Sequence, residues 1–111
     1  MTIKILLVED QKLIRVGLKS LFEGQDEIIV SAEAQSGKEA VEQFKITHPD
    51  VVVMDIGLPD ISGIEATKRI LEHDSKAKVI ILTSHLSEQE IIDALHAGAC
   101  AYVMKDISTD A

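Results

Sequence analysis

The sequence predicts a single α/β domain whose parallel β-sheet is covered by helices on both faces. Apolar runs of strand length alternate with amphipathic segments of helical length, and this alternation holds along the whole chain. Such a pattern favours parallel strands joined by right-handed helical crossovers. With 111 residues and 46% hydrophobic content, the chain is long enough to bury one core, which fits one domain.

The expected elements follow from the apolar patterns in chain order. Strands are expected near residues 3–8, 28–34, 51–54, 79–82 and 100–104, and helices near residues 12–23, 37–47, 63–73 and 88–97. The first, third and fourth strands are almost wholly apolar, so they should lie inside the sheet. The second strand ends with Ser31, Ala32 and Glu33, which is typical of an edge strand.

The helix boundaries have signals of their own. At three expected helix starts a serine stands three positions before a glutamate, which is the capping-box pattern. The pairs are Ser36 with Glu39, Ser62 with Glu65, and Ser87 with Glu90. In the first helix, apolar residues recur at helical spacing at Leu13, Val16, Gly17 and Leu21. Gly98 is well placed to end the fourth helix with a positive φ.

Composition excludes several classes of function. The net charge of −8 argues against nucleic-acid binding by this segment. No apolar run approaches the roughly 18 residues of a membrane span, and the N-terminus leads into a strand rather than a signal peptide. Cys100, which stands between two alanines, is expected to be a small buried hydrophobe. A single cysteine cannot form an intramolecular disulfide, which fits a reducing cytoplasm.

Polar side chains follow four of the five apolar runs at the point where each run ends. Glu9 and Asp10 follow the first run, Asp55 the third, Thr83 the fourth and Lys105 the fifth. The carboxyl ends of parallel strands meet at one edge of a sheet, where ligands bind in open α/β folds. Each residue alone has an ordinary role, such as helix capping by Asp10 or a solvated Lys105. Their joint placement favours one shared site.

These residue types suit a hard metal ion and a phosphoryl group. A carboxylate can accept a phosphoryl group as an acyl phosphate, and the transfer mainly demands positioning and neutralisation of charge. Lys105 would bring a positive charge, and Thr83 a hydroxyl donor, to the phosphoryl oxygens. Mg²⁺ prefers oxygen ligands and keeps several waters. The candidate ligands are Asp10 and Asp55 directly, Glu9 through water, and the backbone carbonyl near Gly57.

Four segments together resemble the receiver domain of two-component response regulators, and the resemblance covers nearly the whole chain. They are Val8-Glu9-Asp10, Met54-Asp55-Ile56-Gly57-Leu58-Pro59-Asp60-Ile61-Ser62-Gly63, Leu82-Thr83-Ser84 and Ala101-Tyr102-Val103-Met104-Lys105. Residues 13–18 and 98–102 further resemble the NarL/FixJ subfamily. Members of that subfamily usually carry a C-terminal helix-turn-helix domain, which is absent from this sequence.

The resemblance implies a flavodoxin-like (CheY-like) fold with strand order 2-1-3-4-5. It implies that Asp55 accepts a phosphoryl group from a sensor histidine kinase, with Mg²⁺ or Mn²⁺ as the cofactor. Thr83 and Tyr102 match the switch hydroxyl and switch aromatic of the family, and Lys105 matches its phosphate-contacting lysine. The domain would then be a signalling switch that controls an output, expected to be transcription, and would catalyse only its own phosphorylation and autodephosphorylation.

Residues 1–111 would form the receiver domain alone. DNA would be reached only through the absent output domain, no membrane contact is expected, and a homodimer on phosphorylation is a further expectation. Residues 107–111 look like the start of a fifth helix whose body is cut off. Two positions depart from the family pattern: Glu9 stands where aspartate is commoner, and Asp106 stands where many receivers have proline, so no cis peptide is expected there.

Three other functions are less consistent with these residues. A receiver-like docking module that works without phosphorylation is the main alternative, although the complete set of site residues argues against it. A flavin-binding electron carrier would need a hydroxyl- and glycine-rich phosphate loop after the first strand, where this chain has Glu9-Asp10-Gln11. A small aspartyl phosphatase typically has an acid two positions after its first-strand nucleophile, where this chain has Lys12.

Overall fold

The structure, a computed structural model, describes residues 2–83 and 88–104, with the backbone alone at Thr83, Glu88, Tyr102 and Met104. The elements are β1 Ile3–Val8, α1 Lys12–Glu23, β2 Ile28–Ala34, α2 Gly37–Thr47, β3 Val51–Asp55, α3 Gly63–His73, β4 Val79–Thr83, α4 Glu88–His96 and β5 Ala101–Met104. All the strands and helices predicted from the sequence are therefore confirmed, and none of their ends differs by more than one residue.

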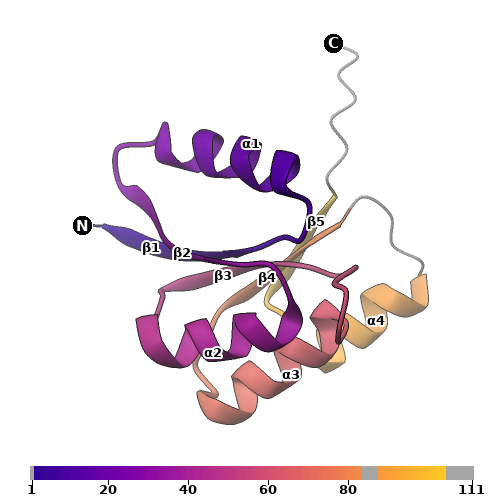
Figure 1. Cartoon of the computed structure of the whole chain (residues 1–111). Coiled ribbons are helices and arrows are strands. Elements are labelled where there is room, and N and C mark those ends of the chain that lie inside the picture. The colour runs from indigo at the N-terminus through magenta and orange to yellow at the C-terminus, as the bar shows by residue number, and fades with distance from the viewer. Residues whose placement is uncertain (1, 84–87, 105–111) are drawn as a thin grey trace.

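The strands form one parallel sheet in the order β2-β1-β3-β4-β5, which is the order that the resemblance implies. β2 is an edge strand, whereas β1, β3 and β4 are interior, as their apolar sequences indicated. Figure 1 shows α1 on one face of the sheet and α2, α3 and α4 together on the other face. In the part of the chain that the structure describes, no helix has the length and apolar character needed to cross a membrane.

Two apolar cores lie on the two faces of the sheet. Side chains alternate between the faces along β1, so Leu6 and Val8 point into one core and Ile5 and Leu7 into the other. The larger core lies under α2, α3 and α4 and also includes Phe44, Val52, Met54, Ala66, Ile70, Val79 and Ile81. The smaller core lies under α1 and also includes Val30, Val53 and Leu82, with Leu18 and Phe22 of the helix packed against it.

Two of the three predicted helix caps lie in described residues, and in both the cap by the serine is confirmed. Ser36 and Ser62 are the N-caps of α2 and α3. Their side chains accept hydrogen bonds of 3.1 Å from the backbone N–H groups of Glu39 and Glu65. The third predicted pair begins at Ser87, which lies outside the described residues.

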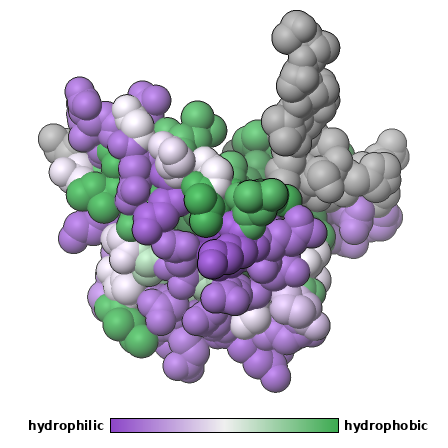
Figure 2. Space-filling model, turned by 45° about the horizontal axis from the view of Figure 1, so that its top comes forward, coloured by the Kyte–Doolittle hydropathy of each residue, from purple (hydrophilic) through white to green (hydrophobic). Residues whose placement is uncertain are grey.

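The apolar residues at helical spacing in α1 do not all face the sheet. Leu13 is 86% exposed, Val16 52% and Leu21 65%. The helix packs instead through Leu18 and Phe22, on another of its faces. Figure 2 shows several hydrophobic patches among hydrophilic residues in the upper half of the molecule, above a largely hydrophilic lower half. Helical spacing therefore identified an apolar stripe, but this stripe is not the surface that contacts the sheet.

The segment between α4 and β5 contains one correct and one wrong prediction. Gly98 has a φ of 105°, as expected for a residue that ends a helix, and an added Cβ would collide with Leu71. Cys100, however, is exposed, so the prediction of a buried cysteine is wrong. The physical reason is its place beside β5, an edge strand on which Val103 is also 50% exposed.

Candidate functional site

The register of the sheet brings Glu9, Asp10, Asp55 and the backbone of Thr83 to one edge. β1, β3 and β4 are adjacent strands, and their last residues pair with one another or lie within one position of doing so. The residues that end or follow these strands therefore lie side by side. The pairs are Val8 with Met54, Asp55 with Leu82, and Thr83 with Met104. The parallel arrangement thus places the ends of the strands side by side, where ligands bind in folds of this type.

Three carboxylates meet at this edge of the sheet. One oxygen from each of Glu9, Asp10 and Asp55 lies within 4.8 Å of the other two. Glu9 is 1% exposed and Asp55 7% exposed, while Asp10 is half-buried. Like charges at this spacing repel each other, and the repulsion is stronger where water is excluded. The cluster therefore favours a bound cation.

The three acids fit Mg²⁺ or Mn²⁺ by chemistry and by spacing. Mg²⁺ takes oxygen ligands at about 2.1 Å in octahedral geometry, so its ligand atoms lie about 3–4 Å from one another. The carboxylate oxygens here lie within 4.8 Å of one another, so small side-chain movements, or one ligand acting through water, would bring them around such an ion. Gly57 lies exposed in the loop after β3, so its carbonyl is a further candidate oxygen.

The loop between β1 and α1 is held by hydrogen bonds around the acidic pair. The N–H of Glu9 donates to the carbonyl of Ala34 in β2 at 3.0 Å, and its carboxylate accepts from the N–H of Gln11 at 3.1 Å. The carbonyl of Glu9 accepts from the guanidinium of Arg15 at 2.9 Å. The N-cap of α1 is Gln11 and not Asp10, so the alternative that Asp10 merely caps the helix does not hold.

The loop between β3 and α3 is tied to the start of α2 through Asp60. Its two carboxylate oxygens accept the N–H groups of Gly37 at 2.8 Å and Lys38 at 2.9 Å. Desolvation raises the pKa of this carboxyl. Hydrogen bonds from backbone N–H groups lower the pKa by a larger amount, so that it falls from 3.8 to about 2; the donors are Lys38, Ile61, Gly37 and Asp60 itself. The negative charge also lies at the positive end of the α2 dipole. Asp60 is thus an anchor of the loop that follows Asp55.

Three predicted site residues are placed only in part or not at all. Thr83 ends β4, and its backbone lies one position beyond the partner of Asp55. The side chains of Thr83 and Tyr102, and all of Lys105, lie outside the described residues. Their roles stay predictions.

Arg15 and Asp60 contact the site loops, but local patterns did not single them out. Arg15 stands three positions before Leu18 and seven before Phe22, so helical spacing puts it on the packing face of α1. A cation on that face is the sequence signal that could have identified it. Its residue exposure is 9%. Asp60 gives no such signal, because its partners, Gly37 and Lys38, are more than 20 positions away in the sequence.

Comparison with known proteins gives a consistent result. Residues 5–111 match the profile of the family described as Response regulator receiver domain. YhcZ of Bacillus subtilis (strain 168), an uncharacterized transcriptional regulatory protein, is 40% identical over 103 residues, which make up 93% of this chain and 48% of YhcZ. A crystal structure of a LuxR-family two-component response regulator from Aurantimonas sp. SI85-9A1 has a TM-score of 0.92 and 40% identity, over 99% of this chain and 77% of that one.

A further solved structure is the CheX-CheY-BeF3-Mg+2 complex from Borrelia burgdorferi, with a TM-score of 0.87 and 30% identity over 93% of this chain and 78% of that one. This chain spans about half the length of the curated relatives that it matches. The family profile nevertheless extends over almost all of its residues, and the described fold has the same architecture as the solved relatives. The chain therefore belongs to the family of response regulator receiver domains.

Proposed function

We propose that this domain is a phosphorylation-dependent switch of a two-component system and that Asp55 is its phosphoacceptor. The supporting observation is the meeting of Glu9, Asp10 and Asp55 within 4.8 Å in a chain of the receiver family. Of the three acids, Asp55 alone ends β3, the central strand of the sheet. It thus stands between the acidic pair on one side and the end of β4 on the other.

The proposed reaction moves a phosphoryl group from a phosphohistidine of a sensor histidine kinase to Asp55. A carboxylate oxygen of Asp55 attacks phosphorus, the new P–O bond forms as the P–N bond breaks, and the electron pair stays on the imidazole nitrogen, which takes up a proton. When bound, Mg²⁺ or Mn²⁺ neutralises charge on the phosphoryl oxygens. Asp10 and Asp55 would hold the ion directly and Glu9 through water, with the carbonyl near Gly57 as a further ligand.

Thr83, Lys105 and Tyr102 carry the response in this proposal. The ammonium of Lys105 and the hydroxyl of Thr83 bind the oxygens of the acyl phosphate. Attraction of Thr83 to the phosphoryl group moves the segment after β4 and changes the space available to Tyr102. The surface formed by residues 84–104 changes as a result, and partners bind one of the two states in preference to the other. The register that puts Thr83 next to the strand end of Asp55 supports this coupling.

The whole protein is proposed to act on transcription. YhcZ is named as a transcriptional regulatory protein, and the Aurantimonas relative as a LuxR-family regulator. The proposed output is a C-terminal helix-turn-helix domain that binds DNA, and the fifth helix expected from residues 107–111 lies outside the described residues. The phosphorylated receiver forms a homodimer in this scheme and works in the cytoplasm. Its only chemistry is its own phosphorylation and autodephosphorylation.

Intact-mass spectrometry after incubation with a small acyl phosphate tests the proposal. The wild type should gain one phosphoryl group in the presence of Mg²⁺ and none when the metal is chelated, because charge neutralisation is required. Asp55→Asn should gain none. Asp26→Asn makes the same chemical change at an exposed acid in the loop between α1 and β2, and it should react like the wild type. An undiminished adduct on Asp55→Asn would refute the assignment.

A further inference from the structure

We infer that Arg15 is a positioning residue of the metal site: its guanidinium holds the peptide group of Glu9 so that the acidic pair faces Asp55. The inference rests on the proposed function, because it assigns Arg15 a role in binding the ion that the proposed reaction needs. Arg15 is 9% exposed and is the one buried residue of α1.

A buried cation in this position needs an explanation. A charge is costly to bury unless it is paired and hydrogen-bonded, and an apolar side chain would serve packing better on the face that α1 shares with Leu18 and Phe22. Among the residues that the structure describes, the buried charged side chains are those of Glu9, Arg15 and Asp55. They lie at the same edge of the sheet, so the cation belongs with the acids rather than with the apolar core.

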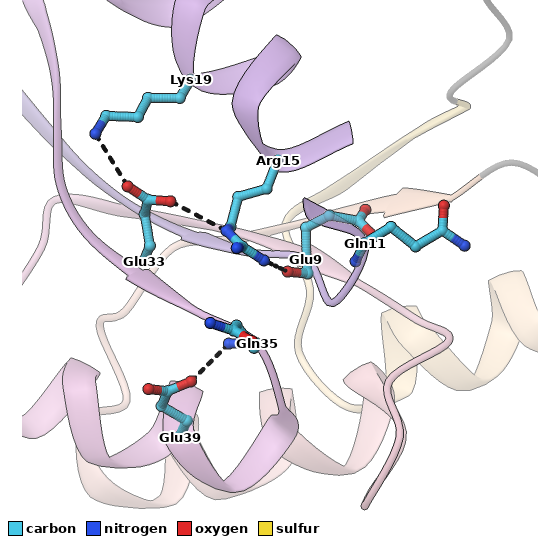
Figure 3. Close-up of polar contacts among 7 residues, drawn as sticks. All are labelled: Glu9, Gln11, Arg15, Lys19, Glu33, Gln35 and Glu39. Carbon is cyan, nitrogen blue, oxygen red and sulfur yellow. Dashed lines mark hydrogen bonds and ion pairs between the residues drawn. The ribbon is translucent and has the colours of Figure 1, made fainter. Parts of the chain in front are cut away.

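The guanidinium of Arg15 joins α1 to β2 and to the loop that follows β1 (Figure 3). Its Nε donates to Oε1 of Glu33 in β2 at 3.1 Å, and its Nη1 donates to the carbonyl oxygen of Glu9 at 2.9 Å. Lys19, one helical turn later, pairs with the other oxygen of Glu33 at 3.1 Å. Because the guanidinium is planar, its two bonds have fixed relative directions, so Glu33 orients the group that binds Glu9.

These contacts fix the plane of the peptide group between Glu9 and Asp10. The peptide group is rigid, so fixing the direction of its carbonyl also fixes the direction in which the Asp10 backbone leaves it. The preceding N–H of Glu9 is held by the carbonyl of Ala34 at 3.0 Å. The backbone of Glu9 is therefore held on both sides, by β2 and by Arg15. Loss of a group that orients metal ligands typically lowers metal affinity by about 10- to 100-fold.

The sign of the effect separates positioning from simple electrostatics. A cation beside an acidic site repels Mg²⁺, so by charge alone the removal of Arg15 would strengthen metal binding. If Arg15 acts by positioning, its removal instead weakens metal binding, because the acidic pair is no longer held in place.

The test measures Mg²⁺ affinity without any phosphodonor, by following backbone amide signals of residues 9–11 and 56–57 in an NMR titration. Arg15→Met should bind Mg²⁺ about 10-fold more weakly than the wild type, the size expected for loss of a group that orients a ligand. Arg15→Lys keeps the charge but loses the planar guanidinium with its two fixed donors, so its Mg²⁺ binding should remain several-fold weaker than that of the wild type.

Lys19→Met is the matched control. It removes the same unit of charge from the same helix and from the same partner, Glu33, but it does not touch Glu9. Its Mg²⁺ affinity should equal that of the wild type or exceed it slightly. Binding by Arg15→Met that is as tight as in the wild type would overturn the inference. Full recovery in Arg15→Lys would also overturn it, because it would show that the planar guanidinium is not needed to hold Glu9.

A second variant covers the case in which Arg15→Met fails to fold. Glu33→Gln leaves Arg15 in place and weakens its anchor on β2, so Mg²⁺ binding should fall by a smaller factor; unchanged binding would again overturn the inference. Thermal melts of each variant show whether the fold is intact. If the wild-type chain bound no Mg²⁺, both the metal site of the proposed function and the role of Arg15 would be refuted. If the wild type bound Mg²⁺ and the Arg15 variants bound it equally well, only the role of Arg15 would be refuted.

Discussion

A single methyl group at Gly63 should displace the backbone of Asp55. Gly63 is the first residue of α3 and is buried, and its N–H donates to the carbonyl of Ile56 at 3.0 Å. A Cβ at this position would overlap the carbonyl oxygen of Asp55 and would lie 2.9 Å from both the Asp55 carbonyl carbon and the Ile56 Cα. All of these are backbone atoms, so no change of rotamer can relieve the collision.

The size of the effect follows from this geometry. Forcing an extra carbon into a packed interior costs about 1–3 kcal/mol, and the backbone must shift because no side chain can give way. The higher helix propensity of alanine offsets less than about 1 kcal/mol of this loss in stability. A net loss of about 1–2 kcal/mol would lower the melting temperature by about 4–10 °C for a domain of this size. A misplacement of about 1 Å at a reacting group can slow a reaction by about 100-fold, so phosphorylation of Asp55 should also slow markedly.

Thermal melts and the rate of phosphorylation by a small acyl phosphate measure both effects. Gly17→Ala is the matched control, because a Cβ at Gly17 would meet nothing within 4 Å. Alanine there should leave phosphorylation unchanged and raise stability by about 0.5–1 kcal/mol. If Gly63→Ala melted at the wild-type temperature and reacted at the wild-type rate, the account of the contact between Gly63 and Asp55 would be wrong.

Three further predictions concern single side chains. Asp10→Ala should weaken Mg²⁺ binding by at least about 10-fold while the domain stays folded, since few carboxylates hold the ion; equal affinities in a titration would contradict this. Because the pKa of Asp60 is about 2 in the folded chain against 3.8 ordinarily, its carboxylate stabilises the fold above pH 4, and this contribution disappears as the pH falls towards 2. Urea unfolding of Asp60→Asn should therefore lack that part of the pH dependence, and an identical pH profile would count against it. Ser62→Ala should lose about 1 kcal/mol in the same assay because α3 loses its N-cap, and no measurable loss would count against that role.

The order of the elements could be predicted because each signal is local. Apolar runs end where polar residues begin, and Ser36 and Ser62 mark helix starts within three positions of sequence. The polar end of β2 identified an edge strand. The cluster of Glu9, Asp10 and Asp55 could also be predicted, because parallel topology alone brings the ends of adjacent strands together. No knowledge of side-chain contacts was needed for any of these steps.

Other features depend on contacts that sequence patterns do not contain. The apolar stripe with Leu13 and Val16 is no less apolar than the packing face of α1, so spacing alone cannot tell which of them meets the sheet. The bond between Asp60 and Gly37 joins residues 23 positions apart. Cys100 has small apolar neighbours in sequence but lies next to an edge strand, where fewer atoms cover it. In each case the outcome is decided by tertiary packing.

The spacing of the three acids depends on elements outside the strands that carry them. The loop with Glu9 and Asp10 is fastened to α1 by Arg15, and the loop after Asp55 is fastened to α2 by Asp60. The two helices lie on opposite faces of the sheet (Figure 1), so the two halves of the site are held from opposite sides. A small shift of either helix against the sheet would therefore change the distance between the carboxylates. The proposed metal site needs near-octahedral geometry, so we expect its affinity for the ion to depend on how α1 and α2 pack against the sheet as well as on the acids themselves.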